Sequence, residues 1–211
     1  MKDILKLLYA YAEGHTGTPG RVLLGLERET YLKTLAPQMI SGHLQGRFLS
    51  LLSHLVQPNY ILEIGTFTGY ATQCLAEGLQ PDGKVITIEI NEELKHIIYT
   101  NLEKASHADQ VEVLFGDALE LIPILDYRFD LVFLDAAKID YAAYYDLVFD
   151  KVSAGGLIIA DNVWWSGKVL EKNKDEESQA IDDFNKKMMK DHRVDNLFLP
   201  LRDGLMICRK K

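Results

Sequence analysis

From residue 58 onward, short apolar segments alternate with segments that have the periodicity of helices. The apolar segments are YILEIG, KVITIEI, VEVLFG, FDLVFLDA and GLIIADN. Apolar strands separated by helices are typical of a parallel β-sheet that helices cover on both faces. The alternation therefore predicts a doubly wound α/β fold.

The two ends of the chain depart from this alternation. Residues 1–57 contain amphipathic helical segments broken at residues 17–20, so we expect this region to be mostly helical. Near the other end, NLFLPL and LMICRK flank residues 202–204 (RDG), which predicts a tight hairpin and at least one antiparallel strand. The length of 211 residues fits one domain, with a helical region at 1–57 and an α/β core at 58–211.

Composition narrows the classes of partner. A formal net charge of −8 at pH 7 disfavours extended contact with nucleic acid or anionic lipid and favours small-molecule partners. Cys74 and Cys208 lie far apart and outside any CxxC pair, which argues against a disulfide framework or a zinc–cysteine site. Because neither a signal peptide nor an apolar run of membrane-spanning length is visible, we expect a soluble, cytoplasmic protein.

The residues that follow the predicted strands are the candidates for a functional site. In a doubly wound sheet, ligands bind beyond the carboxyl ends of the strands, where the strand order reverses. The candidate segments are residues 65–69 (GTFTG), Glu89, residues 116–117 (GD), residues 135–138 (DAAK) and residues 161–162 (DN).

The first of these segments has a glycine pattern that argues against two common ligands. Gly65 and Gly69 lack the middle glycine of the GxGxxG turn that holds the pyrophosphate of a nicotinamide dinucleotide. A phosphate loop needs GxxxxGK followed by Ser or Thr, but Val85 follows Gly83 and Lys84. The pattern suits an adenosine joined to an amino acid, whose carboxylate takes amide donors near a helix start.

Acidic residues near consecutive strand ends extend this interpretation to S-adenosylmethionine. Glu63 precedes the glycine turn, Glu89 is placed to accept hydrogen bonds from both ribose hydroxyls, and Asp117 is placed to accept one from the adenine amino group. The alternative is that Gly65 and Gly69 only turn a strand into a helix while the acidic residues cap helices. The succession of Glu89 and Asp117 favours the cofactor site.

Two later strand ends supply ligands for a divalent cation. Asp135, Asp161 and Asn162 offer the oxygen atoms that Mg²⁺, Mn²⁺ or Ca²⁺ prefers, and they leave positions open for a substrate with two oxygens. Lys138 follows Asp135 by about one helical turn and is placed to act as a general base there. The alternatives are a helix cap and a simple ion pair. The shared position at the binding edge favours a function.

Aromatic residues follow both segments. Trp164 and Trp165 come directly after the predicted ligands, where they either wall a planar substrate or are partly buried like most large side chains. Tyr141, Tyr144 and Tyr145 recur at helical spacing, which indicates packing.

Several motifs occur together in an order that resembles a known family. They are PQMISGHLQGRFL, ILEIGTFTGYAT, VITIEIN, FGDAL, LVFLDAAK, ADNVWWSGKV and LPLRDGLMICRK, and they span nearly the whole chain. The chain thus resembles the cation-dependent O-methyltransferases, which include the catechol and caffeoyl-coenzyme A enzymes, and most of all their small bacterial members. The resemblance implies a Rossmann-like methyltransferase sheet of seven strands with an antiparallel final hairpin. It also implies a homodimer to which residues 1–57 contribute.

The resemblance assigns roles to individual residues. Metal ligands fall on Asp135, Asp161 and Asn162, and the catalytic lysine falls on Lys138. Contacts with S-adenosylmethionine fall on Met39, Gly65, Thr66, Tyr70, Glu89, Asp117, Ala118 and Asp135.

Two positions depart from the family pattern. Ala71 stands where family members usually have a serine that helps to hold the methionine carboxylate. Leu197 or Phe198 stands where the catechol enzyme has a glutamate that orients its substrate.

The leading hypothesis is an O-methyltransferase that uses S-adenosylmethionine and a divalent cation to methylate a vicinal dihydroxy aromatic. A hydroxylated base of transfer RNA is an alternative acceptor, and the net charge of −8 argues against it. A non-catalytic S-adenosylmethionine-binding protein is a second alternative, which would have no use for Lys138 and the predicted metal ligands. A nicotinamide oxidoreductase is disfavoured because GxGxxG is missing.

Overall fold

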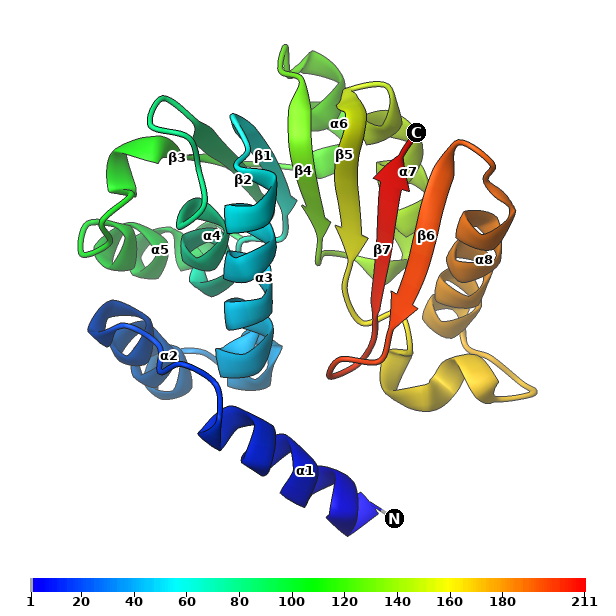
Figure 1. The fold of residues 1–211 in the computed structure, drawn as a ribbon, viewed down its shortest axis with the longest axis horizontal. Helices are drawn as coiled ribbons and strands as arrows, with labels where there is room; N and C mark the ends of the chain where they lie inside the picture. Colours follow the sequence, from blue (N-terminus) through cyan, green and yellow to red (C-terminus); the bar gives the residue numbers. More distant parts are fainter. Residues whose placement is uncertain (1) are drawn as a thin grey trace.

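The computed structural model describes residues 2–211 and contains a seven-stranded sheet flanked by helices (Figure 1). The strand order is β3-β2-β1-β4-β5-β7-β6. The strands are β1 Tyr60–Ile64, β2 Lys84–Glu89, β3 Val111–Phe115, β4 Phe129–Leu134, β5 Val152–Ala160, β6 Val194–Leu199 and β7 Leu205–Lys210. Neighbouring strands from β3 to β5 are parallel, whereas β7 is antiparallel to β5 and β6. The predicted doubly wound fold with an antiparallel hairpin is confirmed.

Helices pack on both faces of this sheet, but on one face they leave β5, β7 and β6 uncovered (Figure 1). The α-helices are α1 Lys2–Gly14, α2 Arg21–Lys33, α3 Gly42–Val56, α4 Tyr70–Ala76, α5 Lys95–Leu102, α6 Ala118–Ile124, α7 Tyr141–Phe149 and α8 Glu176–Lys190. The 3-10 helices are η1 Pro37–Met39, η2 Glu92–Leu94, η3 Ala108–Gln110, η4 Lys138–Asp140 and η5 Trp165–Leu170. Buried residues of α2, α3 and α4 form one core on one face, and those of α6, α7 and α8 form a second core on the other.

The central strand β1 explains why the sequence shows an almost continuous apolar run. Ile61 packs into the core beneath α3 and α4, whereas Leu62 and Ile64 pack into the core beneath α6 and α7. Side chains alternate between the two faces of a strand, so both faces must be apolar when both are covered. Glu63 is the exception, because it is a fully buried carboxyl within this run.

Two predicted boundaries were wrong. The strand predicted over GLIIADN begins four residues earlier, at Val152, which already pairs with Phe129. The final hairpin is wider than predicted, since β6 ends at Leu199 and β7 begins at Leu205. Pro200 follows Leu199 and has no backbone N–H with which to extend the ladder.

The N-terminal region is mostly helical, as predicted, and α1 extends away from the rest of the molecule (Figure 1). Apolar side chains of α1 are exposed, namely Ile4, Leu7, Leu8 and Tyr11. Tyr9 is half-buried, and its hydroxyl accepts a hydrogen bond from the backbone N–H of Arg202 at 2.8 Å. Within residues 2–211, no helix combines the length and apolar character that crossing a membrane requires.

The strand order reverses between β1 and β4, so the residues that follow these two strands meet. The Asp135 N–H donates to the Ile64 carbonyl oxygen at 2.8 Å. Gly65 has a φ of +100°, and a Cβ atom on it would lie 2.1 Å from the Asp135 carbonyl oxygen. Only glycine fits at this position, because the backbone is in the left-handed region and the Asp135 backbone leaves no space for a side chain.

We expect Gly65→Ala to lower the free energy of unfolding by roughly 2 kcal/mol or more, because the added methyl group meets backbone atoms. Chemical denaturation of the purified variant measures this loss. Gly17→Ala is the control, since a Cβ atom there meets nothing within 4 Å. Equal stability of the two variants would contradict the close contact between the ends of β1 and β4.

Candidate active site

A narrow hollow lies where β1 and β4 end. It is lined by Met39, Ile40, Ser41, Gly65, Thr66, Phe67, Tyr70, Ala71 and Asp135. Five residues that were predicted to contact the cofactor are therefore brought together, from η1, the turn after β1, the start of α4 and the end of β4. Gly69, with a φ of +86°, precedes the first residue of α4 and completes the turn.

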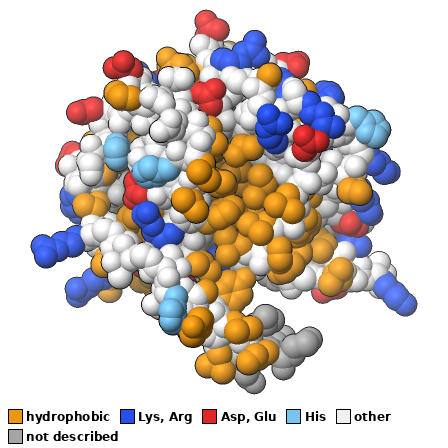
Figure 2. Space-filling view, in the orientation of Figure 1, with side chains coloured by type: hydrophobic (Ala, Val, Ile, Leu, Met, Phe, Trp, Pro, Cys, Tyr) orange, Lys and Arg blue, Asp and Glu red, His pale blue; other side chains and the backbone are white. Residues whose placement is uncertain are grey.

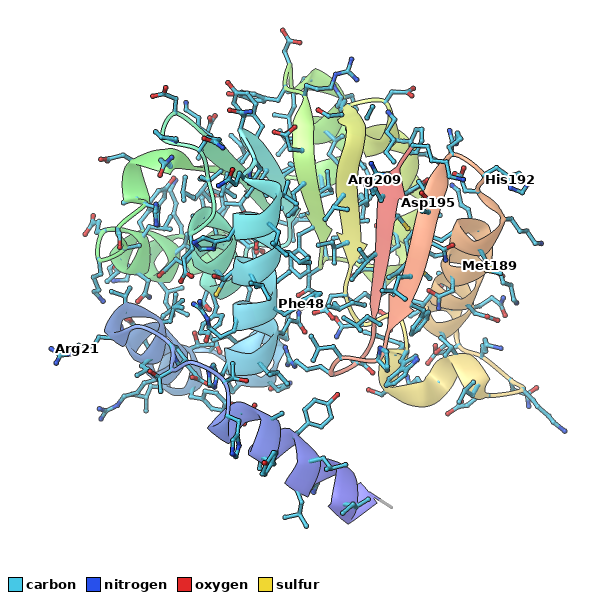
Figure 3. The ribbon with its side chains drawn as sticks, viewed as in Figure 1. Arg21, Phe48, Met189, His192, Asp195 and Arg209 are labelled. Carbon is cyan, nitrogen blue, oxygen red and sulfur yellow. The ribbon has the colours of Figure 1, made fainter. Side chains whose placement is uncertain are left out.

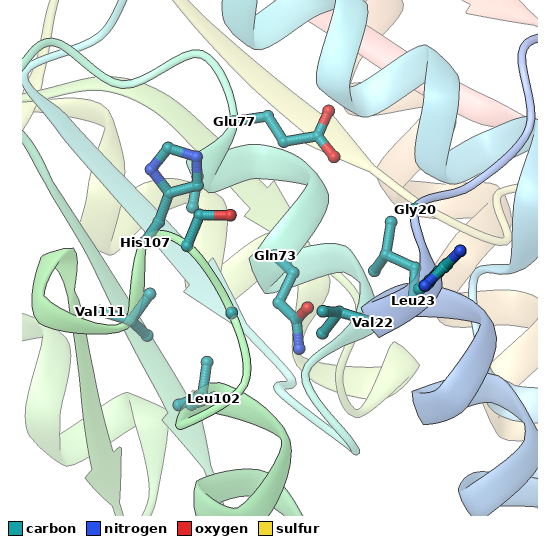
Figure 4. Close-up of a pocket in the computed structure, with 12 residues that line it drawn as sticks. Gly20, Val22, Leu23, Gln73, Glu77, Leu102, His107 and Val111 are labelled. Carbon is teal, nitrogen blue, oxygen red and sulfur yellow. The ribbon is translucent and has the colours of Figure 1, made fainter.

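A larger cavity, of about 140 Å³, lies elsewhere between α2, α4 and α5 (Figure 4). Leu23, Gln73, Glu77, Leu102 and His107 contribute to its lining. None of the predicted site residues lines it, and its walls come from helices, the loop after α5 and the start of β3 rather than from the carboxyl ends of strands. Five of the predicted site residues line the smaller hollow instead.

Glu63 lies directly beneath the turn after β1 and is fully buried. Its Oε2 atom accepts hydrogen bonds from the hydroxyls of Thr72 and Thr87, the second at 2.6 Å. Its Oε1 atom has no hydrogen-bond partner among the residues that the structure describes. Burial raises the pKa of this carboxyl to about 8, so Glu63 is largely protonated at neutral pH.

Glu89 and Asp117 both follow strands, but they differ in burial. Glu89 is buried, and its two oxygens accept from the backbone N–H groups of Phe67 and Asn91 at 2.7 and 2.9 Å. Burial raises the pKa of Glu89. Asp117 is exposed and caps α6 by accepting from the Leu119 N–H at 2.8 Å, while Ala118 is the buried first residue of that helix. Neither Asp117 nor Ala118 lines the hollow.

Lys138 is buried beside the end of β4. Its Nζ atom donates to Asp135 Oδ1 at 2.8 Å and to the Tyr141 hydroxyl at 2.6 Å. The Tyr141 hydroxyl in turn lies within hydrogen-bond distance of the carbonyl oxygens of Leu134 and Asp161, at 3.1 and 3.0 Å. The lysine nitrogen is thus fixed between a carboxylate and a buried phenol at the junction of β4 and β5.

Asp161 is the most buried of the predicted metal ligands. Gln45 Nε2 donates to its Oδ2 atom at 2.6 Å, and the Asn162 N–H donates to its Oδ1 atom at 2.6 Å. Burial and then the nearby Asp135 carboxylate raise the pKa of Asp161 to about 6, against the opposing effects of Gln45 and Lys138. Asn162 has a φ of +57°, a conformation that asparagine tolerates better than most residues.

The oxygen donors of these residues suit a hard divalent cation. Asp135 is close enough for its charge to raise the pKa of Asp161, and Asn162 follows Asp161 directly. Across residues 2–211, no three His, Cys, Asp or Glu side chains cluster as a metal site, so the candidate set depends on the asparagine amide.

The aromatic residues divide into packing and site positions. Tyr141, Tyr144 and Tyr145 are buried as predicted, and Tyr141 and Tyr145 pack edge-on against Phe184. Trp165 lies beside the lysine, with Lys138 Nζ 6.0 Å from its ring centroid. Trp164 packs on Phe198, with ring centroids 6.0 Å apart.

Two residues at this site were not identified from the sequence as contributors to it. Tyr141 was assigned to packing alone, yet its hydroxyl contacts Lys138. Gln45 belongs to α3 and reaches Asp161 across 116 positions of sequence. A glutamine within a helix gives no indication in the sequence that it contacts so distant a residue. Tyr141 could have been identified, because it follows Lys138 by three residues and both therefore lie on one helical turn.

Comparisons with known proteins agree with the fold and the position of the site. The family model described as O-methyltransferase matches residues 15–211. Caffeoyl-CoA O-methyltransferase 2 of Petunia hybrida is 35% identical over 182 residues, which cover 79% of this chain and 74% of that protein. Catechol O-methyltransferase of Mycobacterium tuberculosis is 38% identical over 145 residues, covering 68% of this chain and 66% of that protein. The chain belongs to the O-methyltransferase family.

Solved structures support the same conclusion. The SAH-bound methyltransferase PaMTH1 of Podospora anserina matches with a TM-score of 0.91 and 28% identity, covering 99% of this chain and 96% of that one. An O-methyltransferase of Bacillus cereus, also in complex with SAH, matches with a TM-score of 0.88 and 30% identity, covering 96% of each chain. The sheet is therefore that of the Rossmann-like methyltransferases, and the predicted family is confirmed.

The buried carboxyl of Glu63 predicts a pH-dependent stability. Because its pKa is raised on folding, the folded state keeps this proton where the unfolded chain has lost it, and the unfolding free energy falls between pH 4.5 and about 8. We expect Glu63→Gln to remove this loss, because glutamine does not titrate. As the pH rises through this range, the free energy of unfolding of the variant minus that of the wild type should increase by at most about 1.4 kcal/mol per pH unit.

Urea denaturation at several pH values measures this difference. Glu103→Gln, at an exposed position, is the control and is expected to follow the wild type throughout. A Glu63→Gln profile parallel to that of the wild type would contradict a protonated Glu63.

Proposed function

We propose that the protein transfers a methyl group from S-adenosylmethionine to one hydroxyl of a vicinal dihydroxy aromatic, such as a catechol or caffeoyl-type compound, with a divalent cation bound. The observation that carries this proposal is the buried Lys138, held 2.8 Å from Asp135 at the strand ends that also carry Asp161 and Asn162. The catechol and caffeoyl-CoA enzymes among the relatives favour this class of acceptor.

The hollow at the end of β1 is the proposed cofactor site. S-adenosylmethionine supplies an electrophilic methyl group on its sulfonium. Its methionine part would lie above the protonated Glu63 and would be surrounded by Met39, Gly65, Thr66, Gly69 and Tyr70. Glu89 would accept the ribose hydroxyls, since each of its oxygens has a second lone pair beyond the one used by a backbone N–H. Asp117 and Ala118 would contact the adenine, and Asp135 would contribute where the cofactor and cation sites adjoin.

Asp135, Asp161 and Asn162 are the proposed ligands of the cation, with Mg²⁺ favoured over Mn²⁺ or Ca²⁺. A cation there would lower the proton affinity of an acceptor hydroxyl by its positive charge. The residues fit such an ion because two carboxylates, one of them almost fully buried, share a single buried ammonium group. The excess of negative charge is what a divalent cation would offset.

Lys138 is the proposed general base. A cation beside Lys138 would favour release to solvent of one proton of its ammonium group. The neutral amine would then take the proton of the hydroxyl that is methylated, and Asp135 would stabilise the ammonium formed again. Tyr141 fixes the nitrogen from the other side and remains protonated, because burial raises its pKa well above the usual value. With the acceptor oxygen held in line with the methyl group, much of the acceleration would come from positioning.

We further propose that residues 1–57 cap the site and form part of a homodimer interface. Figure 2 shows an apolar area over the centre of one face. In Figure 3, Phe48 of α3 lies beside the strands left open on this face, and Asp195 and Arg209 lie on the outer pair of strands. Leu51 and Leu55 are 59% and 73% exposed on α3. A second copy would remove these side chains from water.

A cytoplasmic location is also proposed. Cys74 and Cys208 are both free and buried, and burial raises the pKa of each thiol. Free thiols of this kind are compatible with a reducing compartment.

We expect Lys138→Met to lower kcat for methyl transfer to a catechol by about 10²- to 10⁴-fold, because the general base is lost. The measurement is transfer of a labelled methyl group with Mg²⁺ present, with cofactor affinity determined separately. Lys172→Met, at an exposed position, is the control. A kcat within twofold of the wild type would exclude Lys138 as the base.

We expect Leu51→Glu combined with Leu55→Glu to separate the proposed dimer, because buried charges without partners oppose association. Light scattering would then give a mass near that of the 23.9 kDa chain, against twice that mass for the wild type. Met189→Glu, on α8 at the right-hand edge of the molecule in Figure 3 and away from α3, should leave the mass unchanged. A monomeric wild type would contradict the dimer.

A further inference from the structure

Arg202, in the connection between β6 and β7, has a backbone conformation that arginine rarely adopts. Its φ is +50°, in the left-handed region that glycine occupies without strain. Strain of this kind persists only where surrounding contacts hold the residue in place. The contacts of Arg202 therefore indicate the role of its side chain.

Three elements meet at Arg202. Its Nη1 atom donates to the Ser41 carbonyl oxygen just before α3 and lies 3.4 Å from Gln45 Oε1 within α3. Its backbone N–H donates to the Tyr9 hydroxyl of α1 at 2.8 Å. The hairpin is thus joined to the N-terminal helices through one residue.

Gln45 continues this chain of contacts to Asp161. It is fully buried, and its Nε2 atom donates to Asp161 Oδ2 at 2.6 Å while its Oε1 atom faces the Arg202 guanidinium. An amide between an anion and a cation has one favourable orientation, with the NH₂ group toward the carboxylate. The Asn162 N–H holds the other carboxylate oxygen at 2.6 Å. Asp161 is therefore fixed by two donors, one of them positioned by the distant Arg202.

We propose that Gln45 is a positioning residue for Asp161 and that Arg202 and Tyr9 hold it in place, so that cation affinity depends on the contacts of α1 and α3 with the hairpin. This inference rests on the proposed function, because it presumes that Asp161 is a ligand. Side chains that orient metal ligands change metal affinity by about 10- to 100-fold when they are removed.

The test is calorimetric titration of the 211-residue chain with MnCl₂, together with the affinity for S-adenosylhomocysteine and the melting temperature without metal. We expect Gln45→Met to weaken Mn²⁺ binding by about 10-fold or more, since Asp161 loses a donor but the side-chain volume is kept. Gln179→Met is the matched control, because Gln179 also donates to an aspartate, Asp183, at 2.9 Å on an exposed helix face.

Arg202→Gly separates positioning from a purely structural role. It removes the guanidinium and also the backbone strain, so the melting temperature should be unchanged or higher while Mn²⁺ binding weakens several-fold. Arg202→Lys keeps a cation and is expected to retain more affinity than Arg202→Gly. Tyr9→Phe, which removes only the hydroxyl acceptor on α1, should weaken binding least.

The outcomes distinguish this inference from the proposed function. If the wild type binds Mn²⁺ and Gln45→Met binds it within twofold, the positioning role is excluded and the metal site stands. If Gln45→Met does not fold, Arg202→Gly decides, and Mn²⁺ affinity within twofold of the wild type overturns the inference. A wild type that binds no Mn²⁺ overturns both the metal site and the inference.

Discussion

The parallel pairing of β1 with β4 is the contact on which the site depends. Ile64 pairs with Leu134, so the turn after β1 and the carboxylate after β4 begin at the same level of the sheet. The packing of Gly65 against the Asp135 backbone, with room for no side chain, then fixes how the two segments approach each other. The proposed cofactor hollow and the proposed cation ligands become neighbours because these two strands are adjacent.

A group of buried carboxyls is the second feature that distinguishes the site. Desolvation raises the pKa of Glu63, Glu89 and Asp161, while Lys138 is the buried ammonium that pairs with Asp135. A chain gains no stability from gathering carboxylates in this way, because each one must be desolvated. The arrangement is explicable if cationic groups, a sulfonium and a divalent metal ion, complete the site.

The fold could be predicted from the sequence because its signal is local. Apolar strands alternate with helices, and the residues after each strand mark the binding edge whatever the details of packing. The limits of β5 and of the hairpin were missed because they depend on pairing partners and on Pro200. Gln45 and Arg202 were missed for a related reason. Their contacts join α3, the last hairpin and β5, and no periodicity in the chain records a side-chain hydrogen bond between segments so far apart.

The central claim is that the strand ends form a cation-dependent methyl-transfer site. The most direct measurement is transfer of a labelled methyl group from S-adenosylmethionine to a panel of catechols, including caffeic acid derivatives and dihydroxybenzoates, with Mg²⁺ or with a chelator. The account predicts labelled product with Mg²⁺ and none with the chelator. Equal labelling in both conditions, or binding of the cofactor without labelling of any diol, would contradict it.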